Sequence, residues 1–364
     1  MTNKFTSALR RATKLVRAGN PVDATKTIQT ALRGGGMAAL DEMAKSSKKP
    51  FGRPRVGRSL RDTLASLNAG MAQSATTAAD VTEPPLTPGA RFEAATFECP
   101  EGSRDYRLYI PDLKGRKPAA MIMMLHGCKQ SPVDFAKGTG MNQMADAHGL
   151  IVVYPAQSRG ANMQSCWNWY ATSDQTRDAG EPAILAGLAR QMQTDHSVAK
   201  GRVFVAGLSA GAAMSVVLGQ THPDVFSGIG AHSRLPYKAA HDVPSAFAAM
   251  GTGSLRNHET KPIPSIVFHG DADATVHVKN GQHIAEDAAT GAQVVDDGSV
   301  KNRAYTRSTT LAPEGHAVME HWTIAGLGHA WSGGDSTGSY TDPDGPVASA
   351  EMVRFFLNLP MKGA

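Results

Sequence analysis

The sequence of 364 residues has few cysteines, few aromatic residues and no long apolar runs. Its three cysteines, Cys99, Cys128 and Cys166, are too few for a disulfide scaffold and fit no zinc-binding spacing. No stretch reaches the roughly 18–20 apolar residues of a membrane-spanning helix. The N-terminus lacks the apolar segment of a secretory signal, so the expected location is the cytoplasm. A disulfide-rich secreted domain and an integral membrane protein are both excluded.

The charge of the chain is unevenly distributed. Residues 1–61 contain 14 Lys or Arg and 3 Asp or Glu, a net charge of +11, so the total of +5 leaves −6 for residues 62–364. The basic part and the mildly acidic part therefore have to be interpreted separately.

The first 89 residues are predicted to form two parts. Residues 1–33 carry apolar side chains at helical spacing on both sides of Asn20-Pro21, which predicts a basic helical hairpin, or arm. It is either a pair of helices packed weakly on the main domain or a docking element for a surface. Residues 34–89 are rich in small residues, and the basic run Lys48–Arg55 contains Pro and Gly, which predicts a linker. A nucleic-acid-binding role for that run is the weaker interpretation, because no nucleic-acid-binding fold accompanies it.

From residue 90 to residue 364 short apolar runs alternate with helical patterns. Such runs are typical of a parallel sheet covered on both faces, in which ligands bind beyond the carboxyl ends of the strands. The fold class is therefore α/β. The predicted strands are Met121–Leu125, Leu150–Tyr154, Arg202–Ala206, Ser265–Phe268 and Met319–Ile324, and the predicted helices are Met141–His148, Glu181–Thr194, Ala210–Thr221, Val278–Ala289 and Val347–Leu357.

Three of the predicted strand ends carry the residues of a serine hydrolase. Gly207-Leu208-Ser209-Ala210-Gly211 matches the G-x-S-x-G turn that exposes a nucleophilic serine between a strand and a helix. In this fold an acid and then a histidine follow the serine along the chain. The strand ending in His269-Gly270 is followed by two aspartates, of which the H-G-x-x-D pattern selects Asp273 and leaves Asp271 to shape the turn. His329, in a glycine-rich loop, is the predicted base.

An oxyanion hole requires two backbone N–H groups. One is expected from Ala210, which follows the serine, and the helix that begins there directs its positive end at the site. The other is expected from Cys128, since Gly127 lets the loop after the first predicted strand approach closely. Cys128 is therefore not interpreted as a nucleophile.

Together, LHGCKQ, SCWNWY, GLSAGAAM, HGDAD and GLGHAWSGG resemble the esterases of the polyhydroxybutyrate depolymerase family over residues 90–358. The resemblance implies an α/β-hydrolase fold close to that of feruloyl and acetylxylan esterases. It implies Ser209, Asp273 and His329 as the catalytic residues and an oxyanion N–H from Cys128. The basic N-terminal region is similar to an extension of bacterial members without a signal peptide. Secreted polymer-degrading members usually add a substrate-binding domain, whereas this chain ends at Ala364, which weighs against digestion of crystalline external polymer.

The segment around Cys166 has two interpretations. Trp167 and Trp169, together with Trp331, are predicted to contact the substrate near the rim of the site, and the alternative is that these tryptophans pack in the core. Cys166 is also a candidate partner for Cys128 in a disulfide that would fix the oxyanion loop, an arrangement unusual in a reducing cytoplasm.

The expected function is hydrolysis of esters by an acyl-enzyme mechanism without a metal or organic cofactor. Short-chain poly-3-hydroxybutyrate or its oligomers are the first candidate substrates, and small feruloyl or acetyl esters are the second. A hypothesis of another class is a granule- or surface-docking protein with an incidental hydrolase fold. The expected partners are an ester or polyester and, through the basic arm, a polymer granule. Neither nucleic acid nor a transmembrane segment is expected.

Overall fold

The computed structural model describes residues 82–254, 261–281 and 291–361, which belong to the second of the two units of the chain, Thr63–Ala364. The predicted arm and most of the predicted linker lie outside the described residues. Most of the helix predicted at Val278–Ala289 does too.

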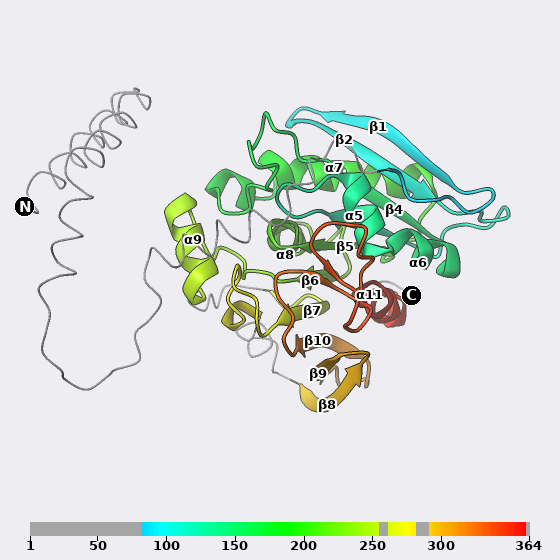
Figure 1. The fold of residues 1–364 in the computed structure, drawn as a ribbon. Helices are drawn as coiled ribbons and strands as arrows, with labels where there is room; N and C mark the ends of the chain where they lie inside the picture. The colour runs from blue at the N-terminus through cyan, green and yellow to red at the C-terminus, as the bar shows by residue number, and fades with distance from the viewer. Residues whose placement is uncertain (1–81, 255–260, 282–290, 362–364) are drawn as a thin grey trace, which may run out of the picture. The chain divides into compact units, whose positions relative to one another are not determined.

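One sheet of ten strands passes through the described part of the chain, in the order β1-β2-β4-β3-β5-β6-β7-β10-β9-β8 (Figure 1). Five neighbouring pairs are parallel, namely β4–β3, β3–β5, β5–β6, β6–β7 and β7–β10. These pairs confirm the predicted parallel sheet. The strands are β1 (Arg91–Cys99), β2 (Gly102–Ile110), β3 (Ala120–Leu125), β4 (Leu150–Pro155), β5 (Val203–Leu208), β6 (Ile229–His232), β7 (Ser265–Gly270), β8 (Ala292–Val300), β9 (Arg303–Leu311) and β10 (Ala317–Ile324), and a small second sheet pairs β11 (Trp331–Ser332) with β12 (Thr341–Asp342).

The helices connect these strands, and several agree with the predicted ranges to within one residue. Helix α5 was not predicted, although its signals are local: the Ser131 hydroxyl accepts the Asp134 N–H, Pro132 is the first residue, and Gly140 ends the helix in a left-handed conformation. The helices are α5 (Pro132–Thr139), α6 (Met141–His148), α7 (Gly180–Asp195), α8 (Ala210–Thr221), α9 (Val243–Thr252) and α11 (Ala348–Asn358), with a 3-10 turn, η1 (Thr172–Gln175).

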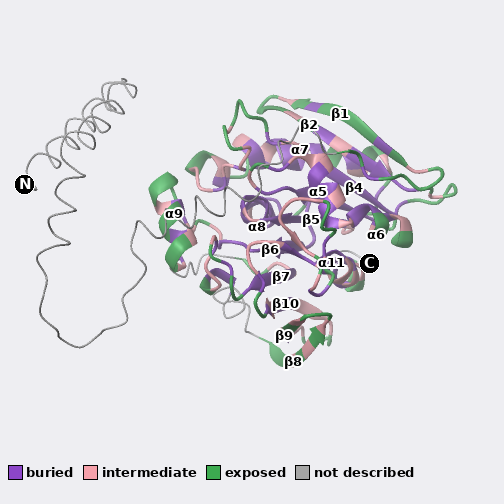
Figure 2. Cartoon of the chain, viewed as in Figure 1, coloured by how far each residue is buried: buried purple, intermediate pink, exposed green. Residues whose placement is uncertain are grey.

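The central strands are buried on both faces, as Figure 2 shows by their purple colour. Alternate residues of one strand enter different cores: in β5, Val203 and Val205 pack with residues of α7 and α8, whereas Phe204 and Ala206 pack with residues of α5, α6 and α11. This explains why the strands are continuously apolar in sequence.

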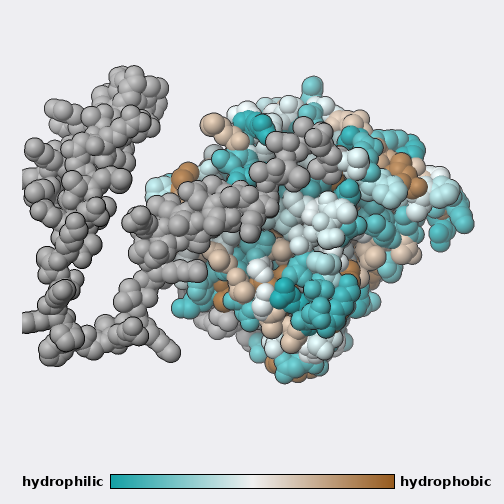
Figure 3. Space-filling view, viewed as in Figure 1, coloured by the Kyte–Doolittle hydropathy of each residue, from teal (hydrophilic) through white to brown (hydrophobic). Residues whose placement is uncertain are grey.

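The outer strands differ from the centre. The hairpins β1–β2 and β9–β8 pair antiparallel at the two edges of the sheet and are partly exposed. In the view of Figure 3, apolar residues form small separate patches on a largely hydrophilic surface. No helix within the described ranges is long and apolar enough to span a membrane.

Candidate active site

Ser209 lies at the turn between β5 and α8. Its φ of 57° and ψ of −118° place a residue other than glycine in a conformation that is strained for an L-amino acid. The surrounding backbone holds this conformation, because the Ser209 N–H donates to the carbonyl of His232, at the end of β6, over 3.0 Å. The serine therefore projects at the carboxyl edge of the parallel strands, where the sequence placed it.

The two glycines of the motif are required by close packing. A Cβ at Gly207 would lie 2.6 Å from the carbonyl oxygen of Leu125 at the end of β3, and a Cβ at Gly211 would overlap the same oxygen. Backbone at these distances leaves no room for any side chain. The elbow is thus held directly against the strand that leads into the predicted oxyanion loop.

Asp273 and His329 are brought together from loops that follow β7 and β10. The Nδ1 of His329 lies 2.8 Å from Oδ2 of Asp273, whose side chain is fully buried, while 13% of the His329 side chain is exposed. The other carboxylate oxygen accepts the N–H groups of Thr275 and Val276 at 2.9 and 2.8 Å. Burial opposes ionisation here, but the charge and hydrogen bond of His329 prevail and hold the pKa of Asp273 below its ordinary value.

Asp271 has a different partner. Its carboxylate accepts the Gly326 N–H at 2.7 Å, which ties the loop after β7 to the loop after β10. Of the two competing aspartates, the structure therefore brings Asp273 to the histidine, and Asp271 braces the turn.

His232 connects the serine loop to the histidine loop, and it was missed in the sequence because β6 was not predicted. Its carbonyl receives the Ser209 N–H, and its Nε2 accepts the Ser332 N–H at 3.1 Å. Its ring stacks on Phe268 and Trp331. Burial lowers the pKa of His232 to about 3, so the ring is neutral and keeps its acceptor lone pair.

The loop after β3 is held by the side chain of His126. The Nδ1 of this buried ring lies 2.8 Å from the Gly127 carbonyl, and its Nε2 accepts the Gln157 N–H at 3.1 Å. These partners assign the proton to Nδ1, which donates to Gly127. Burial lowers the pKa of His126 to about 4 and keeps the ring neutral. Because a peptide is planar, fixing the Gly127 carbonyl also fixes the Cys128 N–H on its other side.

A disulfide between Cys128 and Cys166 ties this loop to the segment after β4. Two further hydrogen bonds join the same segments: the Lys129 N–H donates to the Gln164 carbonyl at 2.8 Å, and Trp167 Nε1 donates to the His126 carbonyl at 3.1 Å. The structure therefore contains the bridge that the sequence left as a hypothesis. Cys99 is a free, partly buried thiol.

The three tryptophans predicted to contact substrate are core residues instead. Trp167, Trp169 and Trp331 are 0%, 5% and 1% exposed. Trp331 packs edge-on against Phe135, and its Nε1 donates to the hydroxyl of Ser349 at 3.2 Å. Residues with at most 5% of their surface exposed offer almost no area to a substrate, so the burial contradicts the substrate-binding prediction and the packing interpretation holds.

Two buried polar groups that support these loops were missed in the sequence. Glu181 accepts hydrogen bonds from Gln157 Nε2 and from the backbone N–H and side-chain amide of Asn168, which fixes the segment that carries Cys166. Gln130 accepts the Gly127 N–H at 2.9 Å and donates to Asp134 at 3.1 Å, which fixes the oxyanion loop. The partners of Glu181 are distant in sequence, whereas Gly127 and Asp134 lie three and four residues from Gln130, a local spacing that was missed.

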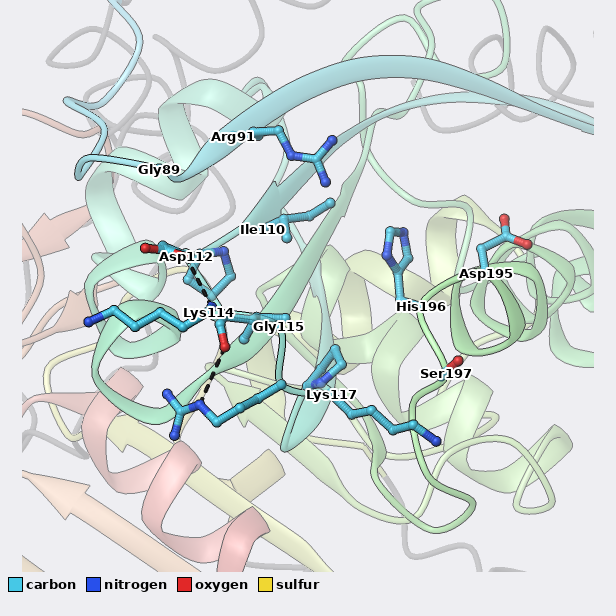
Figure 4. A pocket seen from close by; sticks show the side chains of 14 residues that line it. Gly89, Arg91, Ile110, Asp112, Lys114, Gly115, Lys117, Asp195, His196 and Ser197 are labelled. Atoms are coloured by element: carbon cyan, nitrogen blue, oxygen red, sulfur yellow. Dashed lines mark hydrogen bonds between the residues drawn. The ribbon is translucent and has the colours of Figure 1, made fainter.

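Other kinds of site are not supported in the described ranges. They contain no group of three or more His, Cys, Asp or Glu that could hold a metal ion. A shallow pocket of about 390 Å³ is lined by residues 110–118 and 195–197, which precede β3 and β5 and so border the amino edge of the parallel strands. Figure 4 shows the side chains of Lys114 and Lys117 extending from this loop. The pocket is therefore distant from the carboxyl edge where Ser209, Asp273 and His329 lie.

Comparison with known proteins finds that the chain is similar to esterases. Residues 104–310 match the family described as Esterase PHB depolymerase. The chain is 31% identical to the poly(3-hydroxyalkanoate) depolymerase C of Paucimonas lemoignei, over 61% of this chain and 57% of that protein, and 30% identical to the poly(3-hydroxybutyrate) depolymerase of Ralstonia pickettii, over 61% and 50%. It is 27% identical to a feruloyl esterase B of Talaromyces funiculosus, over 63% and 69%. The chain thus spans about half the length of the two depolymerases.

Among solved structures, an acetyl xylan esterase from Aspergillus awamori superposes with a TM-score of 0.57 at 15% identity, over 74% of this chain and 98% of that one. At this identity the likeness concerns the fold alone. It confirms the predicted α/β-hydrolase fold for the described part of the chain.

Proposed function

Since the chain belongs to the PHB depolymerase family of esterases, we propose that it is a serine esterase that hydrolyses carboxylic esters through an acyl-enzyme. The observation that carries the proposal is the hydrogen bond between Asp273 and His329 at the same sheet edge as the strained turn of Ser209. An aspartate that orients a histidine at the sheet edge that also carries the serine turn is the arrangement expected of a group that activates a hydroxyl as a nucleophile.

In the proposed mechanism the Nε2 of His329 accepts the proton of the Ser209 hydroxyl while its oxygen attacks the ester carbonyl carbon. Asp273 accepts the Nδ1 proton of His329 in a hydrogen bond and stabilises the imidazolium. The tetrahedral intermediate collapses, the carbon–oxygen bond to the alcohol breaks, and His329 protonates the departing alcohol. Water then attacks the acyl-serine by the same route and releases the acid and free Ser209.

The N–H groups of Cys128 and Ala210 are proposed to donate to the oxyanion. Ala210 begins α8, so its N–H is one of those that an α-helix leaves without an intrahelical partner. Cys128 is held by its disulfide and by the contact of His126 with the Gly127 carbonyl. Donors fixed before the reaction are worth a few kcal/mol each in the transition state.

Aliphatic polyester, poly-3-hydroxybutyrate or its oligomers, is the first proposed substrate, because the first relatives bear the names of polyhydroxyalkanoate depolymerases. Feruloyl or acetyl esters of small size are the alternative, since relatives with those names share the same family. The catalytic residues are common to both, so the substrate has to be decided by the surface around the site.

One surface feature favours a large uncharged substrate. Helix α9 contains no charged residue, and Val243 and Phe247, four residues apart on one face, are 48% and 57% exposed. The helix is tied to the segment that carries Asp273, because the His277 N–H donates to the Met250 carbonyl at 2.8 Å. An exposed apolar face on a helix that is joined to this segment suits contact with a solid, uncharged polyester.

The test compares hydrolysis of amorphous poly-3-hydroxybutyrate with hydrolysis of a soluble aryl ester. Phe247→Ser should reduce polymer adsorption and polymer hydrolysis several-fold and leave the soluble ester unaffected. Val295→Ser is the matched control, because Val295 is 59% exposed on β8 at the edge of the sheet. Activity on aryl esters alone would reject the polyester proposal and favour the small-ester alternative.

The basic arm is proposed to direct the esterase to its polymer, on the strength of the net charge of +11 over residues 1–61. Deletion of these residues should abolish co-sedimentation with granules at low salt. Unchanged co-sedimentation would contradict this role. If hydrolysis survives Ser209→Ala, the docking function becomes the main one and the fold is incidental.

The cytoplasmic location stays a prediction. Disulfides such as Cys128–Cys166 are most common in oxidising compartments, which favours a location outside the reducing cytoplasm. Cell fractionation combined with thiol labelling tests the two alternatives together.

A further inference from the structure

Two buried imidazole nitrogens near the proposed site face the same point. His269 on β7 and His321 on β10 lie on neighbouring parallel strands. The exposed fraction of the whole residue is 0% for His269 and 6% for His321. Nδ1 of His269 and Nε2 of His321 are buried and have no hydrogen-bond partner among the residues that the structure describes. Leaving a buried nitrogen unpaired forfeits its hydrogen bond to water, so the two atoms together require an explanation.

The space between them borders Gly281. A Cβ built on Gly281 would lie 2.9 Å from each of the two nitrogens. The nitrogens are therefore separated by less than twice that distance, and they do not hydrogen-bond to each other. That Cβ would be closer to both nitrogens than side-chain carbons come, so only glycine fits at this position, and a small molecule that contacts both nitrogens has to lie farther from the Gly281 Cα.

The chemistry of the two rings selects a neutral occupant that donates a proton. Nε2 of His269 lies 2.8 Å from the Val276 carbonyl, an acceptor, so the proton of the neutral ring is on Nε2 and Nδ1 presents a lone pair. Burial first, and the positive charge of Arg234 in addition, lower the pKa of His269 and of His321. A second proton or a metal cation is therefore disfavoured, whereas water is neutral and can donate to one ring while contacting the other.

We propose that one buried water bridges His269 Nδ1 and His321 Nε2, and that through it His321 and Gly281 act as positioning residues for Asp273. The inference rests on the proposed esterase function. The water donates to His269 Nδ1 and so keeps the His269 proton on Nε2. His269 donates that proton to the Val276 carbonyl. The backbone N–H of Val276 in turn donates to Asp273 Oδ1 at 2.8 Å.

The other tautomer of His269 would harm the site. Its Nε2 lies 3.7 Å from Asp273 Oδ2 as well as 2.8 Å from the Val276 carbonyl. Without a proton, this nitrogen would direct a lone pair at both oxygens and repel the turn that holds Asp273. The groups that face His269 are Asp273, His232, His329, Arg234 and His321.

The functional test uses the full chain and a soluble aryl ester. His321→Leu removes the contact of the water with this ring, and the methyl group of Gly281→Ala crowds both rings and displaces them from the water; each should lower kcat about tenfold and leave KM unchanged. His321→Gln should restore most of kcat, because the amide reaches a position similar to Nε2. His222→Leu is the control, since His222 is also buried but bonds Thr221 at the end of α8.

An equal loss of kcat in His222→Leu, or no recovery of kcat in His321→Gln, would overturn the proposal, because a general loss of packing would then explain the result. A test without activity is ¹⁵N NMR of the histidine rings together with a high-resolution crystal structure. The expected result is the Nε2–H tautomer of His269 and density for one water, and a dry contact or the Nδ1–H tautomer contradicts it. Activity that survives Ser209→Ala would instead reject the proposed function and leave the water site standing.

Discussion

At the scale of single residues, the site consists of strained or buried groups that their neighbours hold in place. Ser209 keeps a positive φ because His232 accepts its N–H and because Gly207 and Gly211 let β3 approach. Asp273 stays ionised although buried, because three groups donate to it, among them His329. Each proposed catalytic group therefore depends on partners from other parts of the sheet.

The roles of the two aspartates can be separated by matched substitutions. Asp273→Asn keeps the shape of the side chain but no longer selects the productive tautomer of His329, so we expect kcat to fall by about 10⁴ with little change in thermal stability. Asp271→Asn should change kcat less than about fivefold, because its acceptor oxygen for Gly326 remains. Steady-state kinetics on one soluble ester compares them, and a larger loss in Asp271→Asn would contradict the assignment.

The sequence predicted the residues whose signal is local and failed for those whose environment is not. The glycines around Ser209 and the order of Ser209, Asp273 and His329 are visible in the chain itself. The packing role of Trp167 is not visible in the sequence, because the burial of this side chain depends on a loop that folds back on His126. His232 and Glu181 had no local signal either, since their partners are many residues away.

At the scale of elements, most strands buried on both faces were predictable, with the four-residue β6 as the exception, and the partly exposed edge strands were not. The apolar runs of β3, β4 and β5 mark them as central strands. Strands β1, β8 and β9 carry mixed, half-exposed sequences, and only pairing with a neighbour identifies them. The edges of the sheet and the short central strand β6 thus came from the structure, while the other central strands and the candidate site residues at their carboxyl ends were predicted from the sequence.

The cross-linked oxyanion loop gives the element-scale prediction. The disulfide closes a loop of 38 residues, for which chain entropy gives a stabilisation of about 3–4 kcal/mol. Cys166→Ser should therefore lower the melting temperature. It should also lower kcat by a factor about ten times larger than the change in KM, because Cys128 is a proposed oxyanion donor. Cys99→Ser is the control, since that thiol is free.

Dithiothreitol should reproduce the effect of Cys166→Ser in the parent protein and leave the variant unchanged. Thiol counting in denaturant should then find one free thiol before reduction and three after it. Three free thiols before reduction would show that the bridge is absent from the protein as isolated.

At the scale of the whole molecule, several buried neutral histidines make stability depend on pH. Burial lowers the pKa of His126 to about 4 and of His232 and His321 to about 3, from an ordinary value of 6.5. Between about pH 6.5 and pH 4 the unfolded chain binds protons at these rings and the folded protein does not. The contribution of these rings to the free energy of unfolding should therefore be at its maximum above pH 6.5 and should fall as the pH decreases through this window.

Urea denaturation from pH 7.5 to pH 4.5 measures this dependence, with an expected loss of up to about 3 kcal/mol per buried histidine. Asp273 and Asp224, whose pKa values are lowered, lose their contribution only below about pH 4 and do not affect the window. His222→Leu should reduce the slope by about one proton, since the pKa of His222 is also lowered, to about 4. A midpoint independent of pH would contradict the burial of these rings.

The central claim, that Ser209 forms the acyl-enzyme, is tested most directly by covalent labelling. An alkyl fluorophosphonate should add once per chain, and peptide mapping by mass spectrometry should find the adduct on Ser209. Ser209→Ala should take up no label and lose ester hydrolysis by at least about 10⁴-fold, with its circular dichroism unchanged. An adduct on another residue, or undiminished hydrolysis by Ser209→Ala, would contradict the account.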